Sequence, residues 1–137
     1  MRTAIDTNVI SAIWSAEASA PRLSAQLGAA STDGALLICP AVFAELCAYP
    51  GATPAFLRKF LDTTGVTVDY RLEEAVWAEA GERFARYADR RRQSAGSSPR
   101  RLLTDFLVGA HALVQAERLL TLDPGIYRRN FPEVSLL

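Results

Sequence analysis

Five short apolar segments recur along the chain, and longer stretches with helical patterning separate them. A short run that is apolar on both faces is typical of a strand that is covered on both sides of a sheet. Strands that alternate with helices favour a parallel sheet flanked by helices. The sequence therefore predicts an α/β fold with strands at residues 3–6, 35–39, 66–70, 118–122 and 134–137.

The segments between these strands carry residues that start or end helices. Thr7 and Asn8 are suitable caps for the first helix, and Pro40 fits the first turn of the third. Helices are predicted at residues 7–15, 21–30, 40–49, 54–65, 72–92 and 104–117, with a polar break at 89–101. We find no repeat and no second hydrophobic core, so residues 1–137 are expected to form one domain.

Composition excludes several classes of protein. No apolar run approaches the roughly 20 residues that cross a bilayer, so no membrane association is expected. Asp6 and Asn8 interrupt any signal-peptide core, which makes a cytoplasmic protein the expectation. Cys39 and Cys47 are the only cysteines and lack zinc-site spacing, so we expect both to be buried as small apolar side chains.

Two acidic residues follow predicted strands directly. Asp6 ends the first strand, and Asp123 follows the strand at 118–122. In parallel sheets, ligands bind beyond the carboxyl ends of the strands. Both carboxylates are therefore expected at the same functional edge of the sheet, although Asp6 could serve only as a helix cap and Asp123 only as a turn residue.

Two further acids fall on apolar helix faces. Glu45 is spaced with Val42, Leu46 and Tyr49, so it is predicted to point inward with them. Asp105 lies in a similar apolar stripe, and Thr104 is predicted to cap its helix. The alternative for Asp105 is a stabilising charge in the first turn of a helix.

Four carboxylates in one pocket would repel one another. Two charges about 4 Å apart cost about 4 kcal/mol at an effective dielectric constant near 20. Either the carboxyl pKa values rise or a divalent cation lies among them. Oxygen ligands select hard ions, which indicates Mg²⁺ with Mn²⁺ as a possible substitute.

Four motifs in order give the chain a resemblance to a known family. The motifs are AIDTNVI, CPAVFAELCA, LLTDFLVGAHA and LLTLDPGIYRRNFPEVSLL, with the acids Asp6, Glu45, Asp105 and Asp123. The chain resembles a PIN-domain ribonuclease, and most closely the VapC toxins of bacterial toxin–antitoxin pairs. The family often has a basic or polar residue where this chain has Leu122, which leaves the acids in place but changes the rim that meets RNA.

The resemblance implies a fold, an activity and partners. The fold would be a three-layer α/β/α PIN domain with a five-stranded parallel sheet flanked by helices. The activity would be Mg²⁺-dependent endoribonuclease, with Asp6, Glu45, Asp105 and Asp123 as catalytic and metal-binding residues. A VapB-like antitoxin would neutralise the toxin, which would form a homodimer.

Metal-assisted hydrolysis fits these residues. One or two divalent ions would activate a water that attacks the phosphate in line, leaving a 5′-phosphate and a 3′-hydroxyl. Residues around the acids would orient carboxylates or water; they are Thr7, Asn8, Thr104 and Thr121. A mechanism with two histidines is excluded, because His111 is the only His and is predicted to be structural or on the surface.

Arginines are candidate contacts for RNA phosphates, since fourteen of the fifteen basic residues are Arg. The candidates are Arg90, Arg91, Arg92, Arg100, Arg101, Arg128 and Arg129. The alternative is a solvated helix end, where Arg also suits the helix dipole. Apolar residues at Trp14, Phe56, Phe60 and Leu61 are candidates for a dimer or antitoxin contact, and core packing explains them equally well.

A catalytically inactive PIN-like scaffold that binds RNA or protein partners is the alternative function. A haloacid dehalogenase-type phosphatase is disfavoured, because it needs a second acid where this chain has Asn8. A receiver domain is disfavoured because it needs a Lys at a late strand end, whereas Lys59 lies within a predicted helix. The sequence leaves open the RNA, the metal count, the oligomer size and the identity of the antitoxin.

Overall fold

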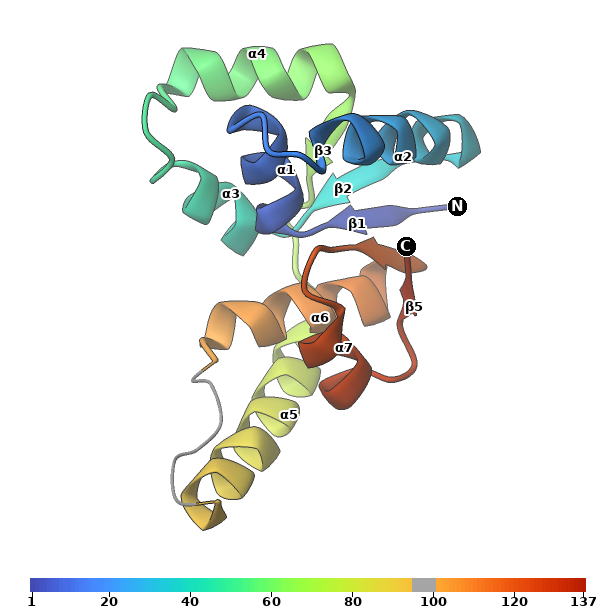
Figure 1. The fold of residues 1–137 in the computed structure, drawn as a ribbon. Helices are drawn as coiled ribbons and strands as arrows, with labels where there is room; N and C mark the ends of the chain where they lie inside the picture. The colour runs from blue at the N-terminus through green and yellow to red at the C-terminus, as the bar shows by residue number, and fades with distance from the viewer. Residues whose placement is uncertain (95–100) are drawn as a thin grey trace.

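A computed structural model describes residues 1–94 and 101–137 (Figure 1). Five parallel strands form one sheet in the order β3-β2-β1-β4-β5. Their bounds are β1 Thr3–Ile5, β2 Leu36–Ile38, β3 Val66–Val68, β4 Arg118–Leu120 and β5 Ser135–Leu136. The predicted five-stranded parallel sheet is confirmed, with each strand shorter than its apolar segment.

Helices flank this sheet on both sides. In Figure 1, α1, α2 and α4 lie on one side, and α5, α6 and α7 on the other. Their bounds are α1 Thr7–Trp14, α2 Ala20–Asp33, α3 Pro40–Leu46, α4 Pro54–Thr64, α5 Glu74–Gln93, α6 Leu103–Gln115 and α7 Pro124–Asn130. No helix of the described residues is long and apolar enough to cross a bilayer.

The caps of two helices differ in part from the predicted ones. Helix α1 begins at Thr7 as predicted, and its cap is Asp6, which accepts the Thr7 amide. The alternative interpretation of Asp6 as a helix cap is therefore confirmed, and Thr7 and Asn8 are not the cap. Leu102 precedes α6, and Thr104 lies inside the helix instead of capping it. In both places an aspartate carboxylate takes up an amide that the helix leaves unpaired.

The polar break was placed too early, and one helix was missed. Helix α5 continues to Gln93, so the first residues of the predicted break at 89–101 are helical. Helix α7 begins at Pro124, where only a turn was expected. Pro fits the first helical turn because its missing N–H has no partner there in any case.

Two burial predictions were wrong in part. Cys39 is buried, and burial raises the pKa of its thiol to about 11, whereas Cys47 is exposed. In the helix predicted at residues 72–92, the apolar spacing places Trp77 on the same side as Val76 and Ala80, yet 55% of Trp77 is exposed. The face of α5 that α6 covers includes the fully buried Val76 and Ala80.

Trp14 is the centre of an aromatic cluster between α1 and α4. Its ring makes edge contacts with Tyr49, Phe56 and Phe60 at centroid distances of 5.1, 5.0 and 5.1 Å. Trp14, Phe60 and Leu61 pack against the core, while Phe56 is 42% exposed. Core packing therefore accounts for most of this predicted contact group.

One glycine sets the distance between α6 and the segment after α7. A Cβ atom at Gly109 would lie 2.3 Å from the ring of Phe131, far inside normal contact. Phe131 is fully buried, so the ring has little room to move away. Gly109 thereby allows the close approach that brings α7 next to α6.

Candidate active site at the carboxyl edge of the sheet

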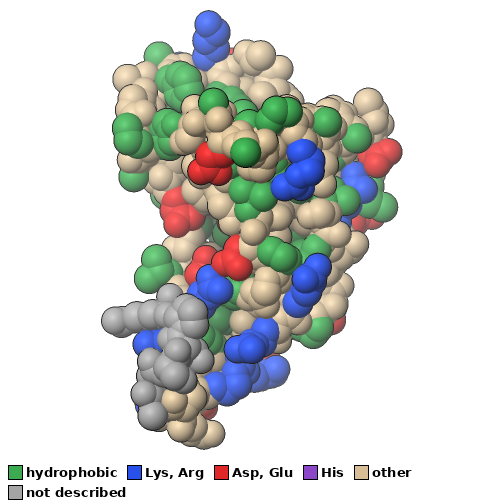
Figure 2. All heavy atoms as spheres, viewed as in Figure 1, with side chains coloured by type: hydrophobic (Ala, Val, Ile, Leu, Met, Phe, Trp, Pro, Cys, Tyr) green, Lys and Arg blue, Asp and Glu red, His purple; other side chains and the backbone are tan. Residues whose placement is uncertain are grey.

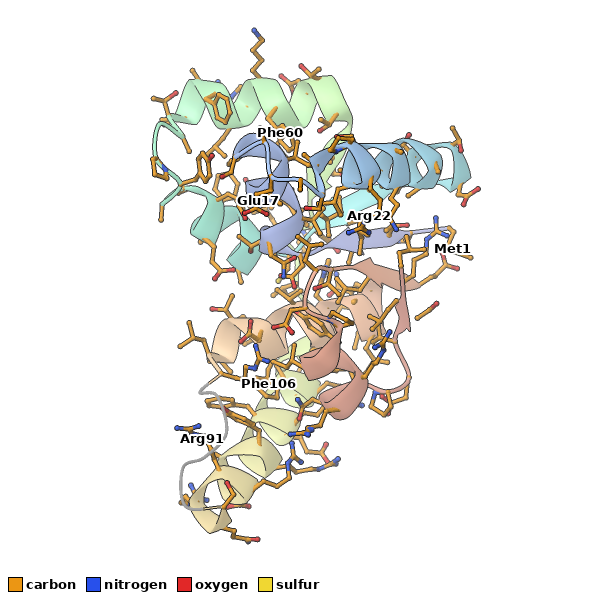
Figure 3. The ribbon with its side chains drawn as sticks, in the orientation of Figure 1. Met1, Glu17, Arg22, Phe60, Arg91 and Phe106 are labelled. Atoms are coloured by element: carbon orange, nitrogen blue, oxygen red, sulfur yellow. The ribbon has the colours of Figure 1, made fainter. Side chains whose placement is uncertain are left out.

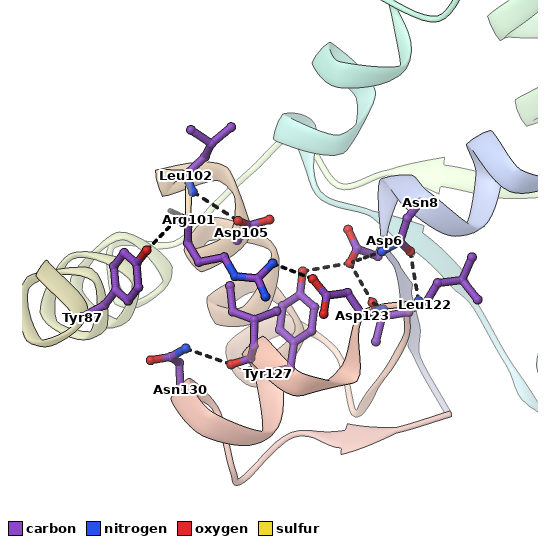
Figure 4. A network of polar contacts seen from close by, with 12 residues as sticks. Asp6, Asn8, Tyr87, Arg101, Leu102, Asp105, Leu122, Asp123, Tyr127 and Asn130 are labelled. Atoms are coloured by element: carbon purple, nitrogen blue, oxygen red, sulfur yellow. Dashed lines mark hydrogen bonds and ion pairs between the residues drawn. The ribbon is translucent and has the colours of Figure 1, made fainter. Parts of the chain in front are cut away.

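Asp6 is the most buried acid of the candidate site, with 8% of the residue exposed. Its Oδ1 accepts the Thr7 amide at 2.8 Å, and Figure 4 shows the Tyr127 hydroxyl next to this carboxylate. Its Oδ2 accepts two hydroxyls, from Thr121 Oγ1 at 2.8 Å and from Tyr127 at 2.9 Å. The carboxylate is therefore held in one orientation by groups from the start of α1, from the residue after β4 and from α7.

Side-chain bonds join the ends of β1 and β4. The Asn8 amide nitrogen lies 3.4 Å from Asp6 Oδ2, and its carbonyl oxygen accepts the Leu122 amide at 3.0 Å. Thr121 Oγ1 accepts the Asp123 amide at 3.0 Å. Asn8 and Thr121 thus lie against the acids, as their places in the sequence predict.

Burial and charge act on the groups around Asp6. Burial raises the pKa of Asp6, hydrogen bonds from Thr121, Tyr127 and Thr7 oppose this, and the charge of Asp105 adds to it. The pKa of Tyr127 is also raised, by burial and by the negative charges of Asp6, Asp105 and Asp123. Tyr127 therefore remains a protonated donor at neutral pH.

Asp105 and Asp123 flank this buried centre. Asp105, in the first turn of α6, accepts the Leu102 amide through Oδ2 at 3.2 Å. Asp123 precedes α7 and accepts Arg101 Nη1 through Oδ2 at 2.6 Å. Figure 4 shows Asp105 and Asp123 close to Asp6 and Tyr127, so the structure brings three of the four predicted acids to one place.

Glu45 differs from its predicted position. The residue is exposed, so it does not share the buried stripe of Val42 and Leu46. Its Oε1 accepts the Thr7 hydroxyl at 2.6 Å, and the Thr7 amide in turn contacts Asp6. Glu45 therefore reaches the site from its rim, through Thr7.

Among the described residues, the acids supply oxygen donors that suit a cation but do not converge on one point. Across residues 1–94 and 101–137, no three His, Cys, Asp or Glu side chains converge closely enough to hold a metal ion. Yet Glu45, Asp105 and Asp123 each keep one carboxylate oxygen without a hydrogen bond to any described residue, and Asp6 Oδ1 accepts only one. This all-oxygen donor set fits a hard divalent cation.

Two predicted residues take no direct part in the contacts among the acids. Thr104 is half-buried, and its hydroxyl makes no hydrogen bond to the described residues. His111 is completely buried, and its Nε2 lies 3.0 Å from Asp69 Oδ2, away from the four acids. Burial lowers the pKa of His111, although Asp69 opposes the change, so the predicted structural role fits.

The arginines predicted to contact RNA differ in whether they line a common cavity. Arg92 forms an ion pair with Asp89, and Arg128 is exposed. The prediction for Arg100 lies outside the described residues. The remaining candidates, Arg90, Arg91, Arg101 and Arg129, line one cavity.

Tyr127, the donor to Asp6, was not predicted from the sequence. The residue lies four positions after Asp123, in a segment that was interpreted as a turn. A Pro at 124 followed by the helical pattern of IYRRN was the available signal for α7. The Arg101–Asp123 pair was also missed, because Arg101 was considered only as a contact for RNA.

Comparison with known proteins identifies the family. A model of the PIN domain family matches residues 3–132. The chain therefore belongs to the PIN domain family. The same fold is found in a chain of the crystal structure of VapBC2 from Rickettsia felis, a complex bound to a DNA fragment from its promoter. The TM-score is 0.69 and the sequence identity is 19%, and the match covers 100% of this chain and 98% of that one. A search of curated proteins found no match.

Proposed function

We propose that this PIN domain is a Mg²⁺-dependent endoribonuclease toxin of the VapC type, which hydrolyses RNA phosphodiester bonds. One observation carries the proposal: the buried Asp6 carboxylate, which accepts the Tyr127 hydroxyl, lies close to Asp105 and Asp123 at the carboxyl ends of β1 and β4 (Figure 4). Fixed negative charge at this edge of a parallel sheet is the usual setting of a site for a ligand or cation.

The cation would be held by carboxylate oxygens that have few protein partners. These belong to Asp6 and Asp105, with Glu45 and Asp123 completing the set. A bound Mg²⁺, or Mn²⁺ in its place, supplies activation of water and stabilisation of charge on the scissile phosphate. Thr121 and Tyr127 hold the Asp6 carboxylate in a fixed orientation, and Asn8 joins the two strand ends that carry Asp6 and Asp123.

Cleavage assays with purified protein test the activity. RNA should be cut in the presence of Mg²⁺, and EDTA should stop the reaction. Asp6→Asn should abolish cleavage, whereas Asp62→Asn on the exposed surface of α4 should leave it unchanged. The new ends should carry 5′-phosphates. Cleavage that persists in EDTA or in Asp6→Asn contradicts the metal site.

The proposed partner is a VapB-like antitoxin encoded beside the toxin. Support comes from the shared fold with a chain of the Rickettsia felis VapBC2 complex. Expression of the chain alone should arrest growth, and co-expression with the neighbouring short reading frame should relieve the arrest. Sequencing of RNA ends after induction would identify the target, and size-exclusion chromatography would test the proposed homodimer.

An inactive scaffold that binds RNA or protein partners is the second candidate. It is favoured by the ion pair of Arg101 with Asp123, which occupies one of the four carboxylates. This candidate predicts RNA binding that is independent of Mg²⁺ and no new RNA ends. The cleavage assay therefore separates the two functions directly.

A further inference from the structure

A cavity of about 430 Å³ lies beside the carboxylates, between the end of α5, the start of α6 and helix α7. Four arginines line it: Arg90, Arg91, Arg101 and Arg129. Figure 2 shows basic side chains gathered on this part of the molecule next to acidic ones. The cavity is within the size range of small-ligand sites, and its chemistry indicates an anion.

Positive charge outweighs negative charge among the described residues that line the cavity, since none of them is acidic. Arg90 Nη2 donates to the neutral Asn130 Oδ1 at 2.6 Å, and Arg129 is exposed and forms no ion pair with a described residue. Arg101 contacts a carboxylate, on Asp123, which lies outside the cavity lining. An anion that enters the cavity therefore meets guanidinium groups without a competing acid among these residues.

Two of the arginines are held in place before any ligand binds. Asn130, which accepts from Arg90, is buried and donates its own amide to the Ile126 carbonyl at 2.9 Å. The Arg101 backbone amide donates to the Tyr87 hydroxyl at 2.6 Å. A preformed arrangement of guanidinium groups lowers the entropic cost of binding an anion.

Arg101 connects this cavity to the candidate active site. The residue lines the cavity, while its Nη1 lies 2.6 Å from Asp123 Oδ2 (Figure 4). A polymer with regularly spaced phosphates can therefore place one phosphate at the acids and another in the cavity. Arginine forks bind phosphate oxygens through paired N–H groups.

We propose that the arginine cavity binds a backbone phosphate of the RNA strand next to the scissile phosphate. Arg101 exchanges its contact with Asp123 for this phosphate when the strand binds, which releases the Asp123 carboxylate. The proposal rests on the proposed function, because that function places RNA at the neighbouring acids. It extends that function by defining where the strand lies beside the cut.

Binding of a fluorescent single-stranded RNA oligonucleotide tests the proposal without cleavage. The protein carries Asp6→Asn, and the buffer contains EDTA. Arg90→Gln and Arg129→Gln should each weaken binding and reduce the slope of log affinity against log salt by about 0.7. Arg22→Gln is the matched control, since Arg22 lies on α2, on the other side of the sheet from Arg91 (Figure 3).

Unchanged affinity and salt slope in both cavity variants would overturn the proposal. So would an acidic peptide of equal charge that binds more tightly than RNA and depends on the same arginines. Thermal unfolding of each variant verifies that the fold is retained. If the wild-type protein fails to cut RNA but the cavity variants still bind RNA more weakly, the proposed catalysis is wrong and the phosphate site is supported. If the wild-type protein cuts RNA but the cavity variants bind RNA as tightly as the Asp6→Asn protein alone, the catalysis is supported and the phosphate site is wrong.

Discussion

The hydroxyl of Tyr127 donates to Asp6 Oδ2 across 2.9 Å, inside a part of the protein where both residues are almost fully buried. The two residues are far apart in the sequence and meet because β1 pairs with β4. A charged acceptor with a buried neutral donor is among the stronger hydrogen bonds in proteins. This bond therefore contributes both to the orientation of Asp6 and to the stability of the fold.

Tyr127→Phe should lower the free energy of unfolding by about 1.5–3 kcal/mol, because the buried carboxylate loses one of its donors. Urea denaturation measures the change. Tyr70→Phe is the matched control, since 67% of Tyr70 is exposed and its hydroxyl makes no hydrogen bond to a described residue. Equal stability of wild type and Tyr127→Phe would contradict the described bond.

Asp6→Asn should be at least as stable as wild type at pH 7 although it loses activity. Because burial raises the pKa of Asp6 above its ordinary value of 3.8, the ionised carboxylate costs stability once the pH exceeds that value. The advantage of the neutral amide should therefore grow as the pH rises from about 4 through the raised pKa. Urea titrations of both proteins from pH 4 to pH 8 measure this difference, and a variant that is clearly less stable at pH 7 would refute it.

His111 should make the protein less stable in mild acid. Burial lowers its pKa below the ordinary value of 6.5, so the unfolded chain takes up a proton before the folded protein does. Stability from this group is complete above pH 6.5 and falls as the pH drops toward the lowered pKa. His111→Gln should show a smaller loss of melting temperature than wild type between pH 7 and pH 5; parallel losses would assign the acid sensitivity to other groups.

Arg101→Gln should bind Mn²⁺ more tightly than wild type, because it removes the cation that occupies Asp123 Oδ2. Isothermal titration calorimetry measures the affinity without any substrate. Arg86→Gln provides a control for the loss of one arginine charge, since Arg86 is exposed on α5 and pairs with Glu82. A weaker or unchanged Mn²⁺ affinity would show that Asp123 does not contribute to a cation site.

Gly109→Ala should destabilise the protein by about 1–3 kcal/mol, as overpacking of a buried contact usually does. Its Cβ would meet the buried ring of Phe131. Gly28→Ala is the opposite case. Gly28 lies within α2, and no atom lies within 4 Å of the position that a Cβ atom would take. Alanine also has a higher helix propensity than glycine. Melting temperatures should fall for the first variant and rise slightly for the second.

The fold could be predicted largely from the sequence because parallel strands leave a simple pattern. The run 35–39 is apolar throughout, and 118–122 consists of leucines apart from Arg118 and Thr121. The residue that ends or follows such a run identifies the edge of the sheet. The pattern alone was therefore enough to place Asp6 and Asp123 together. Their catalytic role is still a prediction for the assays above.

Other features depend on choices that periodicity does not determine. Glu45 lies on a helix of only seven residues, too short for spacing to distinguish an inward from an exposed side chain. Whether Arg101 contacts Asp123 or a ligand depends on rotamers and neighbours from three helices. Tyr127 was missed because a Pro-Gly pair begins both turns and short helices, and only tertiary packing determines which one forms.

The strand order has a consequence for when the candidate site is completed during synthesis. Strand β1 is made first, but its neighbour β4 comes much later, and the donor Tyr127 follows Asp6 by 121 residues. A nascent chain that has not yet reached β4 and α7 therefore lacks the groups that orient Asp6 and the acid at Asp123. Under the proposed function, the nuclease site is completed only once these segments have left the ribosome.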